Sequence, residues 1–241
     1  RRYGLLAIVL FLATGFFSSA QGQAPITAED PNRWQFTWSP YVWMSSIKGD
    51  VTLKGREGSL DASFLHLLGH VYLGFTSHME LQKGRWSVYL DPWYAKLSDD
   101  KDRVLPLRGP TNIETTMKQY IVEFGGTYRV GTWPIGSRSY SKMGLELLGG
   151  GRYWYTKVEV DFDPGDSRDK SKDWIDPIVG ARLKIGLLEK LSLQLRGDIG
   201  GFGVGSEFSW NAVGFLTYDL SQRFSIVAGY RALGVDYESG S

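Results

Sequence analysis

Apolar and polar residues alternate along most of the chain beyond residue 32, and turn-forming residues separate the alternating segments. In the segment from Trp86 to Tyr94, Val88 and Leu90 lie on one face, and Tyr89 and Asp91 lie on the other. A period of two is typical of β-strands, because successive side chains of a strand point to opposite faces. The pattern therefore predicts an all-β protein. The nine predicted strands lie near residues 33–43, 71–81, 86–94, 119–130, 143–156, 175–187, 191–199, 208–218 and 224–230.

The two faces of these strands differ in chemistry. One carries charged and polar residues and the other carries residues suited to lipid, as in the wall of an antiparallel up-and-down transmembrane β-barrel. Such barrels also have aromatic girdles at both membrane interfaces. Two alternatives stay open: a β-sandwich, which gives the aromatic residues no role, and a soluble lipocalin-like barrel, whose apolar faces would point inward. The aromatic residues predicted near strand ends are Trp34, Trp43, Trp86, Tyr94, Tyr128, Trp133, Tyr153, Tyr155, Trp174, Tyr218 and Tyr237.

The connections between the predicted strands alternate in length, as in bacterial barrels with short periplasmic turns and longer extracellular loops. The short ones are 82–85, 188–190 and 219–222, with a moderate one at 131–140; the long ones are 44–70, 98–114 and 160–173, with a glycine-rich one at 200–206. Single-chain bacterial barrels have an even strand count, because both ends return to the periplasm. Nine strands therefore predict a tenth, following Ser241, and a gap or strained contact between residues 34–42 and 224–230.

The N-terminal segment has the order of a secretory signal peptide. Arg1 and Arg2 precede an apolar run of 15 residues, 3–17, and the small residues Ser18 and Ala20 follow it. This run is short of the roughly 20 residues that a membrane-spanning helix needs. We expect cleavage after Ala20, with Ala24 as the second choice. The predicted organisation is a signal peptide at 1–20, a periplasmic lead-in at 21–32, and a C-terminally incomplete outer-membrane barrel at 33–241.

Composition narrows the function. The net charge of +1 leaves no basic excess for a nucleic acid partner, and zero cysteines exclude disulfides and thiolate metal sites. The glycine runs at 149–151 and 200–205 do not lead into a helix with the Lys-Ser/Thr pair of a phosphate-binding loop. They indicate bends or close packing in a barrel wall instead. The sequence predicts no metal and no cofactor.

Three histidines limit the enzymatic alternatives. His66 and His70 are four residues apart and could share a metal, but no glutamate follows His66 as a zinc-protease motif requires. A solvent-facing or loop-packing role is favoured for both. His78 falls on the polar face between Thr76 and Glu80, with no nucleophile motif beside it. A membrane-embedded hydrolase or acyltransferase is the alternative function, and clustering of Ser, His and Asp in the folded barrel would support it.

Charged residues on the polar faces form the candidate site. The acidic ones come mainly from the first strands and the basic ones from the later strands. As well-paired ions they would fill a narrow lumen, whereas as two opposed walls they would create a transverse field across a small pore. We favour structural ion pairs, because side chains fill a barrel of about eight to ten strands. The predicted lumenal network comprises Glu80, Asp91, Glu123, Glu146, Arg152, Arg182, Lys184, Arg196 and Arg231.

Five segments, at residues 38–55, 61–70, 79–99, 196–210 and 224–240, carry a family resemblance, most specifically in GDIGGFG and AGYR. They resemble a poorly characterised family of Gram-negative outer-membrane β-barrel proteins, loosely related to the OmpW-like and OmpA-like small barrels. The resemblance implies an outer-membrane barrel with a last strand after the DYESG-like stretch, and no catalytic or ligand-binding residues.

The resulting functional prediction is a non-enzymatic integral outer-membrane protein, either a narrow channel or a structural or surface-interaction protein. Its expected partners are outer-membrane lipid and lipopolysaccharide, with small polar solutes if the lumen is open. The predicted location is the outer membrane of a Gram-negative cell, reached by export through a cleaved signal peptide.

Overall fold

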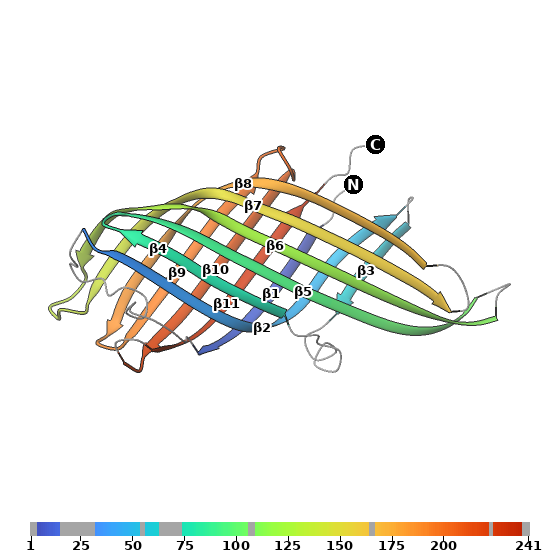
Figure 1. Ribbon diagram of the computed structural model, residues 1–241, viewed down its shortest axis with the longest axis horizontal. Coiled ribbons are helices and arrows are strands. Elements are labelled where there is room, and N and C mark those ends of the chain that lie inside the picture. Colours follow the sequence, from blue (N-terminus) through green and yellow to red (C-terminus); the bar gives the residue numbers. More distant parts are fainter. Residues whose placement is uncertain are drawn as a thin grey trace.

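The computed structural model describes the backbone of residues 4–14, 32–53, 56–62, 74–105, 109–163, 167–221 and 224–237, and the side chains of residues 32–40, 76–96, 116–159, 169–221 and 224–237. This part of the chain forms one antiparallel sheet (Figure 1). Within it, no helix is long and apolar enough to cross a membrane. The strands are β1 (Gly4–Thr14), β2 (Trp34–Leu53), β3 (Arg56–Ala62), β4 (Gly74–Lys83), β5 (Trp86–Leu105), β6 (Gly109–Pro134), β7 (Lys142–Asp163), β8 (Ser167–Leu188), β9 (Leu191–Gly201), β10 (Phe208–Asp219) and β11 (Ser225–Asp236).

The sheet closes on itself. From β4 to β11 each strand pairs with the next in sequence, β4 also pairs with β2, and β1 pairs with both β11 and β2. In the described sheet β3 pairs with β2 alone, along the end of that strand, so eleven strands less β3 leave ten around the wall. All of these pairings are antiparallel. The predicted up-and-down barrel is confirmed, and its nine predicted strands correspond to β2 and to β4 through β11.

Strand β1 belongs to the apolar segment that the sequence assigns to a signal peptide. It lies between β2 and β11 and pairs with both, through Leu5–Leu12 on one side and Gly4–Thr14 on the other. The expected gap or strained contact between residues 34–42 and 224–230 is therefore replaced by an intervening strand. Cleavage of residues 1–20, a periplasmic lead-in at 21–32 and a further strand after residue 241 stay predictions.

We expect the protein recovered from bacterial outer membranes to begin at Gln21, because Ser18 and Ala20 are the small residues that precede a cleavage site. Intact-mass measurement of the extracted protein checks this. After cleavage, the backbone groups of β2 and β11 that now pair with β1 need another strand, since each unpaired group in lipid costs several kcal/mol. Recovery of the chain with Arg1 still attached would contradict cleavage.

Three predicted long loops contain strand instead. Residues 44–70 include the end of β2 and all of β3, residues 98–114 include the ends of β5 and β6, and residues 160–173 include the ends of β7 and β8. The prediction failed because alternation requires one buried or lipid-facing side. The run at 99–103 (DDKDR) is charged throughout and has no apolar alternation to detect. His66 and His70 lie outside the described residues.

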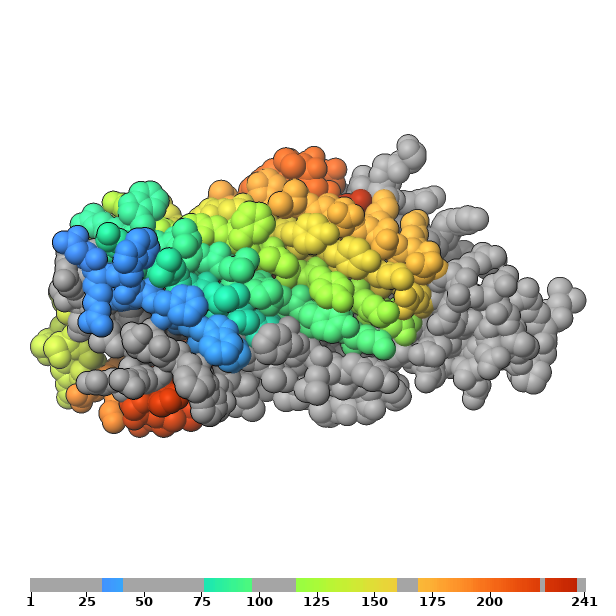
Figure 2. Space-filling model, in the orientation of Figure 1, coloured from blue at the N-terminus to red at the C-terminus, as the bar shows by residue number. Residues whose placement is uncertain are grey.

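The apolar faces of the strands point outward, as predicted. Val88, Leu90, Phe124, Leu147 and Leu195 are all exposed on the outer wall, and part of that wall is visible in Figure 2. The same alternation predicts a lipid-facing side for Val71, Leu73, Val122, Leu145 and Leu193, and the last three are half-buried on that face of their strands. The other two, Val71 and Leu73, lie outside the described residues. These orientations exclude the soluble lipocalin-like barrel, whose apolar faces point inward.

Aromatic residues form contacts near both ends of the apolar wall. On the side of the tight turns, the rings of Trp86 and Tyr128 are 4.7 Å apart. Toward the other end of the wall, the ring centroids of Tyr94 on β5 and Tyr120 on β6 are 4.6 Å apart. Those of Tyr120 and Tyr155 on β7 are 5.7 Å apart. Two residues predicted for these girdles, Trp174 and Tyr237, pack against an inner apolar cluster instead. Both residues lie near strand ends, as girdle residues do, but they alternate in phase with lumenal residues of their own strands and therefore point inward.

Glycines allow close backbone approach at the centre of the wall. A Cβ on Gly150 would lie 2.0 Å from the carbonyl oxygen of Phe124, and one on Gly125 would lie 2.3 Å from the carbonyl oxygen of Gly149. The close packing expected for residues 149–151 is therefore present. At 201–203 the chain turns through three consecutive residues with positive φ, including Phe202 at 52°.

Candidate functional site

Inward-facing charges gather in the barrel lumen. Each lies on the face of its strand opposite to the lipid-facing residues, because side chains alternate along a strand. All nine residues of the predicted network make ion pairs there. They are Glu80 on β4, Asp91 on β5, Glu123 on β6, Glu146 and Arg152 on β7, Arg182 and Lys184 on β8, Arg196 on β9 and Arg231 on β11.

The central cluster is built around Arg152, which is fully buried. Its Nε donates to Oε1 of Glu123 at 3.0 Å, and its Nη2 donates to Oδ1 of Asp198 at 2.6 Å. Glu123 is the direct cross-strand neighbour of Arg152, whereas Asp198 reaches it from β9. One guanidinium therefore ties three strands of the wall together inside the lumen.

Two further arginines complete the central cluster. Arg196 donates to Glu123 at 2.8 Å, to Asp198 at 2.9 Å and to Asp91 at 3.4 Å. Arg231 pairs with Glu123 and donates through Nε to Oδ1 of Asn211 at 2.8 Å. The cluster thus holds three arginines and the three carboxylates of residues 91, 123 and 198, so its formal charges cancel.

A second group of charges, the turn-side cluster, lies nearer the tight turns. Arg182 donates to the Glu80 carboxylate from Nη1 at 2.6 Å and from Nη2 at 2.7 Å. Its Nε donates to Glu146 at 2.6 Å. Lys184 and Arg129 also lie within ion-pairing distance of Glu146, at 3.3 and 3.4 Å. The two-point contact between β8 and β4 crosses the lumen, because these strands are not neighbours in the sheet.

His78 connects the two clusters. Its Nδ1 contacts Asp91 of the central cluster, and its Nε2 lies 3.2 Å from Glu80 of the turn-side cluster. Ser87 lies in the same region, but its hydroxyl donates to Glu80 at 2.7 Å. Both ring nitrogens of His78 face carboxylates, so neither is placed to activate a serine as a catalytic triad requires.

An apolar layer covers the central cluster on the side away from the tight turns. Its central row consists of Trp93, Ile121 and Trp154, which are cross-strand neighbours. This row lies two residues farther from the tight turns than the row of Asp91, Glu123 and Arg152, on the same inner face. Trp154 and Ile121 are 0% and 1% exposed. The layer comprises Trp93, Ala95, Ile121, Trp154, Leu233 and Val235, with Trp174, Phe215 and Tyr237 packed against it.

Asp176 anchors this apolar layer to the turn between β9 and β10. It accepts hydrogen bonds from Nε1 of Trp154 at 2.9 Å and from the backbone N–H and hydroxyl of Ser206 at 2.7 and 2.9 Å. The Trp154 ring stacks on Trp174 with centroids 5.6 Å apart, and Trp174 stacks on Tyr237 at 4.4 Å. These contacts fix the orientation of the Trp154 ring, which is fully buried in the lumen.

The hypothesis of one acidic and one basic wall is wrong. Asp198 and Asp176 come from β9 and β8, on the side predicted to be basic, and Asp198 contacts two arginines directly. Both aspartates alternate in phase with other inward residues of their strands, so the sequence pattern could have included them. The pairing of His78 across strands depends on register, which alternation alone does not fix.

The lumen is therefore filled by neutralised ion pairs on one side and by an apolar layer on the other. Buried charges of this kind are stable only when they are paired and hydrogen-bonded, and the three central carboxylates all meet that condition. Among the described residues, no group of three or more His, Cys, Asp or Glu is arranged to hold a metal ion.

Comparisons with known proteins give a distant likeness of fold. No protein-family model and no curated protein match the chain. The crystal structure of Ail, the attachment invasion locus protein of Yersinia pestis, in complex with the heparin analogue sucrose octasulfate, is similar at 13% identity and a TM-score of 0.35, covering 98% of this chain and 99% of that chain. The translocator domain of the autotransporter NalP from Neisseria meningitidis is similar at 9% identity and a TM-score of 0.42, covering 98% and 88%. These likenesses concern the fold alone.

Proposed function

We propose that this protein is an integral outer-membrane barrel with a closed lumen, acting at the cell surface as a structural or binding scaffold rather than as an open channel or an enzyme. The observation that carries the proposal is the complete burial of Arg152 and Trp154 in consecutive layers of the lumen. A water-filled pore would leave such side chains exposed to solvent along its axis.

The outer-membrane location is supported by the closed wall with its apolar outer face. In a bilayer only helices and closed barrels satisfy all of their backbone hydrogen bonds, so the wall needs β1, or after cleavage a strand in its place, between β2 and β11. Transmembrane barrels of this antiparallel kind are characteristic of bacterial outer membranes.

The role at the cell surface is supported by the lengths of four strands. Strands β5, β6, β7 and β8 contain 20, 26, 22 and 22 residues. A membrane-spanning strand needs only about 9–11 residues. With the tight turns in the periplasm, the excess length of these strands projects as a sheet beyond the extracellular membrane boundary, where it offers a surface to partners.

The enzymatic alternative receives less support from the site. Ser87 and His78 both use Glu80 as a partner, so the serine hydroxyl does not engage the histidine. A hydrolase or acyltransferase would need a different arrangement of these side chains.

Single-channel recording of the refolded protein in a planar bilayer tests the closed lumen. We expect no unitary conductance steps from the parent protein. The triple variant Ile121→Ala, Arg152→Ala, Trp154→Ala removes side chains from both layers that fill the lumen and should produce conductance. The matched variant Trp86→Ala, Phe124→Ala removes aromatic side chains from the outer wall and should stay silent. Stable conductance steps from the parent would overturn the proposal in favour of a channel.

A further inference from the structure

Two parallel rows of side chains cross the outer wall on strands β5, β6 and β7. Tyr94, Tyr120 and Tyr155 are cross-strand neighbours and form the first row. The second row lies two residues farther from the tight turns on each strand, so its side chains point to the same outer face. Its members are Lys96, Lys118 and Lys157, which are also cross-strand neighbours.

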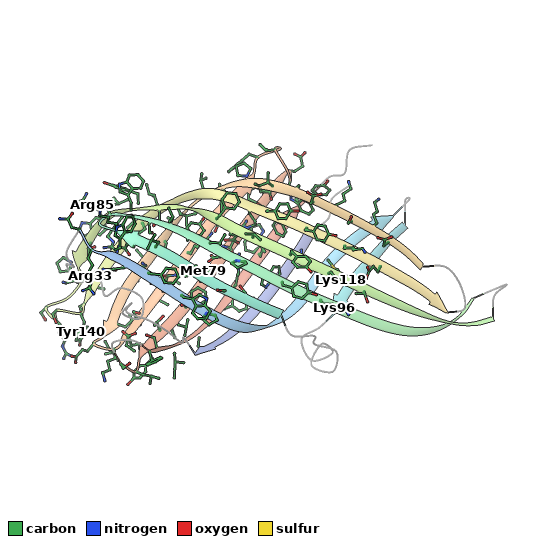
Figure 3. The ribbon with its side chains drawn as sticks, viewed as in Figure 1. Arg33, Met79, Arg85, Lys96, Lys118 and Tyr140 are labelled. Carbon is green, nitrogen blue, oxygen red and sulfur yellow. The ribbon has the colours of Figure 1, made fainter. Side chains whose placement is uncertain are left out.

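The tyrosine row indicates where hydrocarbon ends. Its rings touch in sequence, and below it the outer wall carries exposed Leu90 and Phe124. Tyrosine rings prefer the boundary between hydrocarbon and headgroups. Lys96 and Lys118 appear side by side in Figure 3, far from Arg33 and Arg85 at the end with the tight turns. The lysine row therefore lies at the depth of the extracellular headgroups.

Acidic groups contact two lysines of this row, Lys118 and Lys157. Glu159 accepts from Lys118 at 2.8 Å and from Lys157 at 2.6 Å, and Asp169 lies 3.2 Å from Lys157. Each ammonium has three N–H donors, so both lysines keep donors for another acceptor. Their side chains are 32% and 27% exposed, which leaves them open to a ligand.

We propose that the lysine row, Lys96, Lys118 and Lys157, binds the phosphate groups of lipopolysaccharide in the extracellular leaflet. The inference rests on the proposed outer-membrane location. Three lysines on adjacent strands face the headgroup layer, with Glu159 between two of them, and the tyrosine row beneath them lies toward the acyl region. Phosphate groups carry negative charge at this depth, and clustered lysines are attracted to anionic headgroups.

The test measures binding of fluorescent, phosphorylated lipid A to the full chain in nanodiscs of zwitterionic phospholipid. The triple variant Lys96→Gln, Lys118→Gln, Lys157→Gln should weaken binding by at least about tenfold, since each lysine near a charged membrane surface contributes and Glu159 shields two of them. Glu159→Gln removes the competing carboxylate and should strengthen binding. The matched variant Lys83→Gln, Lys142→Gln, Lys190→Gln removes the same charge at the opposite end and should bind as the parent does.

Two additional measurements show whether the phosphate groups of lipid A, rather than its acyl chains or free phosphate, account for the binding. Dephosphorylated lipid A should bind the parent as weakly as phosphorylated lipid A binds the triple variant, and inorganic phosphate should not compete at equal concentration. Heat-modifiable migration on gels, recorded for each variant, reports that the barrel has folded and inserted. An inserted triple variant that binds like the parent would overturn the site, whereas failure of the parent to insert would count against the outer-membrane location itself.

Discussion

Replacing Arg152 with methionine should lower the free energy of unfolding by about 3–5 kcal/mol, because two buried carboxylates lose a charged partner at once. The variant leaves Glu123 and Asp198 in the lumen, where neither can be solvated as in water. Guanidinium-induced unfolding in lipid vesicles, followed by tryptophan fluorescence, gives the measurement. Arg138→Met is the matched control, since Arg138 is exposed and contacts Tyr140. A loss of under about 0.5 kcal/mol at Arg152 would show that the central cluster does not stabilise the barrel.

Replacing Leu147 with arginine should cost about 2–4 kcal/mol, although Leu147 is 53% exposed. In a soluble protein an exposed leucine tolerates this change, but here the surrounding medium is hydrocarbon. The same vesicle unfolding experiment measures the effect. Val204, which is 70% exposed in the turn between β9 and β10, provides the contrast. Val204→Arg should have no measurable effect, and equal costs at both positions would mean that Leu147 does not face lipid.

Alternation of apolar and polar residues was enough to predict the wall of the barrel. Leu90 and Asp91 are adjacent in sequence, and they lie on opposite faces because one face meets hydrocarbon and the other meets charged partners. The same alternation identified the charged residues that point inward, including Arg152 and Glu123. Wherever one face of a strand meets lipid, the alternation of apolar and polar residues shows which residues lie on that face.

Other features had no such signal. The end of β5 and the start of β6 carry polar or charged residues at both phases of the alternation, so no apolar periodicity marks them as strands. The contact between Arg182 and Glu80 joins residues 102 positions apart, across the lumen, and depends on barrel closure rather than on either local pattern. Trp174 resembles a girdle residue in sequence, and only its phase relative to Asp176 reveals that it packs inward.

Cysteine accessibility on β7 tests most directly whether this is a lipid-facing barrel with a closed lumen. The chain has no native cysteine, so single substitutions report without interference. A fluorophore at Leu147→Cys should be quenched by a lipid-soluble quencher. Leu148→Cys, whose native side chain is 6% exposed on the inner face, should be reached neither by that quencher nor by a water-soluble thiol reagent. Quenching at Leu148→Cys instead of Leu147→Cys would reverse the faces of the wall, and reaction of Leu148→Cys with the water-soluble reagent would show an open, water-filled lumen.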